Sequence, residues 1–137
     1  MYSIKSNLKY HLLFFLFLAA IFIESSFPAE TYPEVEIVGA DKLVHIGVYG
    51  LLAFFCYLSL IHREKVSLFK MYPLIMTVVI CSIYGASDEI HQFFVPNRDA
   101  EMWDWVADTA GALIAVIIIR YYLRKKYKMF KLNEKPA

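Results

Sequence analysis

Long apolar stretches dominate the chain and are separated by short polar segments. They cover about residues 10–27, 43–61, 71–94 and 103–123. Each has about the twenty residues that a helix needs to cross the hydrocarbon core of a membrane. Strict alternation of apolar and polar residues, which a membrane β-barrel requires, does not occur. The pattern predicts an all-α membrane protein with a bundle of four transmembrane helices, because helices satisfy their own backbone hydrogen bonds in lipid.

The composition agrees with a membrane protein of one domain. Of 137 residues, 59% are hydrophobic and 20% are charged, which argues against a soluble globule and excludes a disordered chain. The net charge of +1 gives no basis for a nucleic-acid partner. The transmembrane domain is expected over residues 10–123, between a segment 1–9 and a basic tail 124–137. A signal peptide is the alternative for the first stretch, but Glu24 and Phe27 stand where a cleavage site needs small residues.

Charged residues are divided unevenly between the two sides of the expected bundle. Twelve of the 14 basic residues fall in the N-terminal segment, the 62–70 loop and the region from Arg120 onward. Eleven of the 13 acidic residues fall on the other side. Because short loops rich in Lys and Arg stay in the cytoplasm, both termini are predicted to be cytoplasmic. The lipid bilayer is the expected partner, and the oligomeric state is left open.

Polar residues are costly inside a membrane, so their positions are informative. They gather at the predicted outer ends of the second, third and fourth stretches and in the connection between the last two. These residues are Asp41, Lys42, His45, Asp88, Glu89, His91, Gln92, Arg98, Asp104 and Asp108. Members spaced four apart, such as Asp41 and His45 or Asp104 and Asp108, share a helix face. The sequence therefore predicts a polar pocket at the outer side.

Small residues continue the face of Asp104 and Asp108. Gly111 and Ala115 lie on that face, which predicts a helix packed closely against its neighbours, with its acids pointing into the bundle. Carboxylates close together repel each other, and nearby cations such as Lys42 offset that repulsion. The pocket is interpreted either as a stable buried network or as an acid–base site.

Familiar motifs of catalysis and cofactor binding do not occur. The segment 88–92 reads Asp-Glu-Ile-His-Gln, which is not the H-E-x-x-H zinc motif, and the chain has neither a glycine-rich phosphate loop nor a G-x-S-x-G motif. No cofactor and no metal site are therefore assigned. Cys56 and Cys81 lie within apolar stretches and form no C-x-x-C motif, so both are interpreted as small apolar residues.

Three segments resemble the VanZ-like family of bacterial membrane proteins. They are Ser25-Ser26-Phe27-Pro28, then Asp41-Lys42-Leu43-Val44-His45 with Tyr49, and then Ser87-Asp88-Glu89-Ile90-His91-Gln92-Phe93 followed by Pro96-x-Arg98, Asp104, Asp108 and Gly111. The third is the most specific, because its acids, Gln, Arg and Gly keep the family's order and spacing. Three positions depart from the family pattern. Asp108 stands where Asn is usual, Ala115 where a second Gly is frequent, and Ile46 where Phe is frequent.

The resemblance implies a four-helix protein of the bacterial cytoplasmic membrane. The family's founding member is associated with resistance to the glycopeptide teicoplanin, whereas the biochemical activity of the family is not well defined. A link of this chain to glycopeptide resistance is left open, because many family members lie outside resistance clusters. The charge that Asp108 adds puts in doubt any role that needs a neutral amide there.

Four functions are compatible with the predicted pocket. The favoured one is binding of a lipid-linked or cell-wall ligand. A second is an enzyme acting on an outer-leaflet substrate, with Glu89 or Asp88 as general base and His45 or His91 as acid. In that hypothesis Arg98 clamps an anion, and a divalent metal held by carboxylates and histidine is a variant. A transport pathway is disfavoured because the inner halves of the helices are nearly all apolar, and a purely structural network is the remaining alternative.

Overall fold

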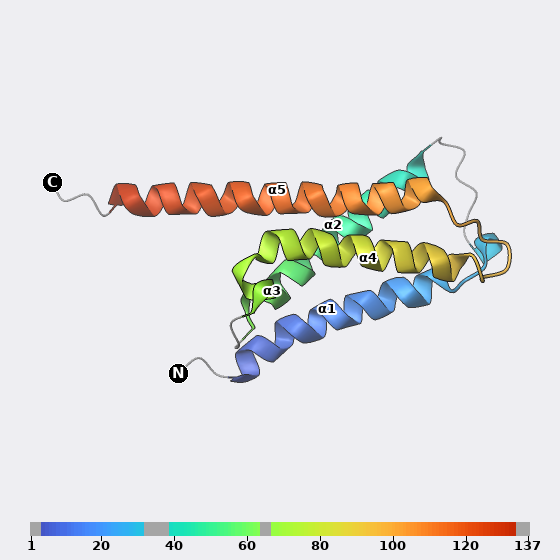
Figure 1. The fold of residues 1–137 in the computed structure, drawn as a ribbon, viewed down its shortest axis with the longest axis horizontal. Coiled ribbons are helices and arrows are strands. Elements are labelled where there is room, and N and C mark those ends of the chain that lie inside the picture. Colours follow the sequence, from blue (N-terminus) through green and yellow to red (C-terminus); the bar gives the residue numbers. More distant parts are fainter. Residues whose placement is uncertain (1–3, 32–38, 64–66, 134–137) are drawn as a thin grey trace.

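Four long helices form the bundle in the computed structural model, which describes residues 4–31, 39–63 and 67–133 (Figure 1). The long helices are α1 (Ile4–Ser25), α2 (Ala40–Ile61), α4 (Pro73–Gln92) and α5 (Met102–Asn133), and the connections hold the short 3-10 turn η1 (Ala29–Thr31) and the helix α3 (Leu68–Met71). No strand occurs within these described ranges. All four long helices are long and apolar enough to cross a membrane. The predicted all-α fold with four membrane-spanning helices is confirmed.

The helix ends differ from the apolar stretches in ways that matter for the site. α2 begins at Ala40, so Asp41 and Lys42 lie in its first turn. α4 begins at Pro73, where the missing N–H of proline costs no helical hydrogen bond. α5 continues past residue 123 to Asn133, so most of the basic tail is a helical extension.

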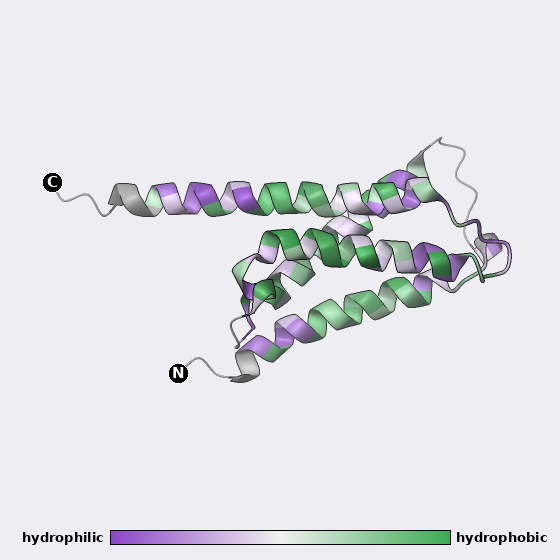
Figure 2. Ribbon diagram, viewed as in Figure 1, coloured by the Kyte–Doolittle hydropathy of each residue, from purple (hydrophilic) through white to green (hydrophobic). Residues whose placement is uncertain are grey.

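Consecutive long helices run in opposite directions, so the first residues of α1 and the last residues of α5 lie at the same end of the bundle (Figure 1). α2 makes the most extensive contacts of the four long helices: it packs against α1, α4 and α5, and its contact with α5 is the largest. We call the end where α2 and α5 begin and α4 finishes the polar end, and the opposite end the basic end. Hydrophilic residues mark both of these ends, and apolar residues fill the stretch between them (Figure 2).

Small and aromatic side chains fill the interior of the bundle. The most deeply buried apolar residues are Tyr49, Leu52, Ala53, Cys56, Cys81 and Ala112. Both cysteines are free thiols. Many large apolar side chains, such as Phe15 and Ile117, point away from the bundle. In a membrane they face lipid chains that are as apolar as they are, so they need no protein cover.

α2 and α5 approach each other very closely at Gly111. A Cβ atom built on Gly111 would lie 2.3 Å from the carbonyl oxygen of Ile46, so no larger residue fits without moving a backbone. Ala115, one turn further along α5, is half-buried and packs against the core. This contact holds the N-terminal parts of α2 and α5 side by side, and those parts carry Asp41, Asp104 and Asp108.

Candidate functional site

Several acids of the polar end are buried between helices instead of facing solvent. Asp108 is fully buried, and Asp88, Glu89 and Asp104 are each less than one-tenth exposed. A charge removed from water is costly unless it is paired or hydrogen-bonded. The partners of each acid therefore decide what the polar end can do.

Lys42 joins three carboxylates at the rim of the polar end. Its Nζ lies 2.7 Å from Asp41 Oδ2, 2.6 Å from Glu101 Oε2 and 2.6 Å from Asp104 Oδ1. The Lys42 side chain is 28% exposed, whereas those of Asp41 and Glu101 are about half exposed. One cation is thus shared by three acids, which leaves the rim with a negative excess.

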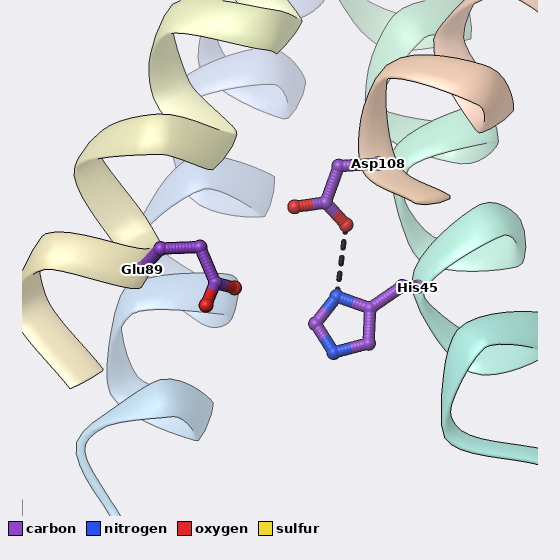
Figure 3. Close-up of side chains that lie close together, drawn as sticks. All are labelled: His45, Glu89 and Asp108. Atoms are coloured by element: carbon purple, nitrogen blue, oxygen red, sulfur yellow. Dashed lines mark hydrogen bonds and ion pairs between the residues drawn. The ribbon is translucent and has the colours of Figure 1, made fainter. Parts of the chain in front are cut away.

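A second group lies deeper and joins three helices. His45 from α2, Glu89 from α4 and Asp108 from α5 point toward one another (Figure 3). His45 Nδ1 and Asp108 Oδ1 are hydrogen-bonded at 2.8 Å. Each of the three residues offers a ligand atom, and these atoms lie within 4.8 Å of one another. His45 Nε2 faces Asp104 Oδ2 at 3.8 Å, which links this group to the rim.

Three buried oxygen atoms near this group have no hydrogen-bond partner among the residues that the structure describes. They are Glu89 Oε1, Asp108 Oδ2 and the hydroxyl of Tyr49. The other oxygen of Glu89 accepts a hydrogen bond from the backbone N–H of Glu101 at 2.8 Å. Native proteins satisfy most buried polar groups, so three unsatisfied atoms in one place call for an explanation.

Gly85 makes room for the buried carboxylate of Asp108. A Cβ on Gly85 would lie 2.8 Å from Asp108 Oδ2 and 3.3 Å from the ring of Tyr49. The absence of a side chain on α4 therefore lets the Asp108 carboxylate lie between α4 and α2. Asp41, Lys42, His45, Glu89, Glu101, Asp104 and Asp108 form what we call the carboxylate cluster.

Other residues of the predicted pocket take partners on the side of α1. Gln92 donates a hydrogen bond to Asp88 Oδ2 at 3.3 Å, one helical turn away on α4. The hydroxyl of Ser25, at the end of α1, also lies against the Asp88 carboxylate. His91 Nε2 is hydrogen-bonded to Ser26 Oγ at 3.0 Å. The contacts of Ser25 and Ser26 join α4 to the end of α1, so Asp88 and His91 take hydrogen-bond partners different from those of His45.

Arg98 is also held from α1. Its guanidinium lies 3.6 Å from Glu24 Oε1, and the neighbouring Asn97 donates a hydrogen bond to Glu30. Arg98 was predicted to belong to the polar pocket. Its ion pair with Glu24 ties the connection between α4 and α5 to the end of α1.

Sequence reasoning missed two members of the site. Glu101 is the residue just before α5 and was absent from the predicted pocket. It lies three residues before Asp104, a spacing that places two side chains on the same side of a helix. Gly85 carries no chemistry of its own, and only the packing of α4 against α5 shows that it accommodates Asp108. The spacing could have indicated Glu101, whereas no local pattern indicates Gly85.

The fold and the site define a class: a multi-pass membrane protein of four helices with a carboxylate cluster between three of them. The VanZ/LLP1 family model matches residues 1–124. The chain belongs to the VanZ/LLP1 family, and the resemblance seen in its motifs is confirmed. No curated protein and no solved structure matches the chain.

Proposed function

We propose that this protein binds a cell-envelope ligand at the polar end of its bundle, on the outer side of the bacterial cytoplasmic membrane. One observation carries the proposal: Glu89 Oε1 and Asp108 Oδ2 are buried, and they lack a partner within the described part of the chain. Binding sites keep a few polar groups unpaired in mostly apolar surroundings until a ligand pairs them. The half-exposed carboxylates of Asp41 and Glu101 mark the approach to these atoms.

The charge distribution supports an outward-facing polar end. Four basic residues of the α5 extension, Arg124, Lys125, Lys126 and Lys128, are exposed at the opposite end. Positive charges near the ends of transmembrane helices stay in the cytoplasm, and they also attract anionic lipid there. The basic end is then cytoplasmic, and the carboxylate cluster opens toward the cell wall.

The surroundings of the cluster favour a ligand with both a polar and an apolar part. The excess of carboxylates calls for a cationic or hydrogen-bond-donating group. Large apolar side chains are exposed close by at the polar end, namely Phe93, Phe94, Met102 and Trp103. Aromatic residues commonly lie at the membrane interface, where they contact lipid. A lipid-linked envelope precursor has a polar head group that can contact the carboxylate cluster and a hydrocarbon chain that can contact these exposed apolar side chains.

The test is native mass spectrometry of the full-length protein extracted from its membranes in mild detergent. The wild type should retain an envelope lipid that Glu89→Gln and Glu101→Gln lose while accumulating at normal levels. Glu30→Gln removes an acid that lies outside the cluster and should keep the lipid. Identical spectra for all four proteins would refute the proposal, and loss of the two cluster variants from the membrane would favour a structural network.

A role in glycopeptide resistance is a finer proposal that rests on the family's association alone. Expression in a teicoplanin-susceptible Gram-positive host should raise the inhibitory concentration of teicoplanin, and Glu89→Gln should remove that increase. An unchanged inhibitory concentration with the wild type would refute it.

An enzyme of the outer leaflet is the second candidate function, favoured by the hydrogen bond between His45 and Asp108. A histidine oriented by a carboxylate is a common general base, and Glu89 faces the same space. Time-dependent conversion of a retained lipid by the purified wild type, absent in His45→Gln, would distinguish catalysis from binding.

A further inference from the structure

We propose that His45, Glu89 and Asp108 hold one divalent metal ion that accepts mixed nitrogen and oxygen ligands, such as zinc or manganese. The inference deepens the proposed function, on which it rests for the location of the site. The metal ion would be the cation bound by the inner group of the carboxylate cluster, which consists of His45, Glu89 and Asp108.

The two acidic groups of the polar end differ in how their charge is compensated. Asp41, Glu101 and Asp104 offer ligand atoms within 4.8 Å of one another, as the inner group does. The ammonium of Lys42 already contacts all three of these acids. In the inner group, Asp108 has His45 as its charged or polar partner, and Glu89 has a backbone N–H. All three rim acids therefore contact one ammonium group, whereas in the inner group Glu89 has only a backbone N–H as its hydrogen-bond partner within the described part of the chain.

The unsatisfied atoms point to the same place. Glu89 is 8% exposed and Asp108 is fully buried, yet each has one oxygen without a partner in the described part of the molecule. The hydroxyl of Tyr49, one helical turn from His45, is a third such atom. A metal ion that keeps one water molecule would engage both carboxylates directly and Tyr49 through that water.

The geometry fits the bonds that such ions form. Donor atoms up to 4.8 Å apart surround a central point less than about 2.8 Å from each of them, compared with typical bonds of about 2.0–2.2 Å for zinc. Small rotations of the three side chains close this difference. The view down the site shows the carboxylates and the imidazole directed into one shared space from three helices (Figure 3).

Asp104 is placed to orient the imidazole. Its Oδ2 lies 3.8 Å from His45 Nε2, whereas Nδ1 is hydrogen-bonded to Asp108 Oδ1, one of the proposed ligands. Histidines that bind metals commonly donate their other ring N–H to a carboxylate, which sets the orientation of the ring. A donor set of one nitrogen and two carboxylate oxygens suits zinc, manganese and iron(II) better than thiolate-seeking ions.

The experiment uses the full-length protein in detergent, stripped with a chelator and titrated separately with Zn²⁺, Mn²⁺ and Mg²⁺ by isothermal titration calorimetry. The wild type should bind about one Zn²⁺ or Mn²⁺ per chain. His45→Gln and Glu89→Gln should weaken that binding more than about tenfold. Because ligands must lose their protons, binding should release protons, which is seen as a dependence of the heat on the buffer.

Asp88→Asn is the matched control, because Asp88 is an equally buried acid next to Glu89 that takes its partners from Gln92 and Ser25. It should bind the metal as the wild type does. Asp108→Asn restores the residue usual in the family, so it should fold and show weakened binding. Absence of metal binding by the wild type, retention of it in both ligand variants, or equal loss in Asp88→Asn would overturn the proposal.

Mass spectrometry of the same samples distinguishes the two proposals. If the retained lipid persists after chelation and no metal binds, the metal site is wrong and the ligand-binding function stands. If metal binds and no lipid is retained by any preparation, the metal site stands and the ligand-binding function is wrong.

Discussion

Replacing Gly111 with alanine should push α2 and α5 apart and destabilise the bundle. The new Cβ would lie 2.3 Å from the carbonyl oxygen of Ile46 and 2.9 Å from its Cα. Both atoms belong to a helix backbone, so relief requires movement of a whole helix and not of one side chain. Adding a methyl group to a well-packed interior typically costs about 1–3 kcal/mol, and a rigid backbone places this case at the upper end.

Alanine also favours a helix over glycine by about 1 kcal/mol, which opposes that cost. The net expectation for Gly111→Ala is a loss of about 2 kcal/mol in the free energy of unfolding. Gly47→Ala supplies the control, since a Cβ on Gly47 of α2 would meet no atom within 4 Å. It carries the gain in helix propensity without the clash, so it should be neutral or stabilising by up to about 1 kcal/mol.

Equilibrium unfolding in mixed detergent and SDS measures the difference, with tryptophan fluorescence as the signal. Trp105 is a suitable reporter because its indole N–H donates to the backbone oxygen of Ser82 at 3.0 Å and so senses the contact of α5 with α4. If Gly111→Ala proves as stable as Gly47→Ala, the close approach of α2 and α5 is wrong. The positioning of the carboxylate cluster by that approach would then be wrong as well.

Three further variants test other parts of the structure. Lys42→Met should lower stability by about 2 kcal/mol in thermal unfolding, because three carboxylates lose their shared ammonium in a half-buried setting, and Lys42→Arg should restore part of the loss. Tyr84→Phe removes the hydrogen bond from α4 to the Leu18 carbonyl, 2.7 Å long, and should cost about 1 kcal/mol in the same assay; an unchanged melting curve would contradict that contact. The proposed topology, with both termini cytoplasmic, predicts that a cysteine at Asp99 reacts with an impermeant maleimide in intact cells and that one at Lys128 reacts only after permeabilisation. The reverse pattern would refute this topology.

The membrane-spanning helices could be predicted from the sequence because spanning a bilayer is a local requirement. Each segment must satisfy its own backbone hydrogen bonds and present about twenty apolar residues to lipid, so its own composition identifies it. Helix ends were less predictable. The apolar stretches end where charged residues begin, whereas α5 continues through a basic segment to Asn133, since lysine and arginine are good helix formers in water.

Most residues of the polar end could also be named in advance, because polar groups at the ends of apolar helices are rare and costly. Their pairing was beyond any local pattern. Lys42 contacts Glu101, which lies 59 positions further along the chain, and His45 contacts Asp108, which is 63 positions away. The register of α2 against α5, set where Gly111 meets Ile46, brings these residues together.

Neighbouring acids on α4 illustrate what only tertiary structure decided. Asp88 and Glu89 are adjacent in sequence and equally buried, yet they point about 100° apart on the helix surface. Asp88 takes its partners from Gln92 and the end of α1, and Glu89 faces His45 and Asp108. Composition and spacing determined by themselves that this protein crosses the membrane four times with acids at one end. The packing of α4 between α1 and α5 decided which acids pair with α1 and which lie beside His45, because helix rotation and register depend on contacts between segments far apart in the chain.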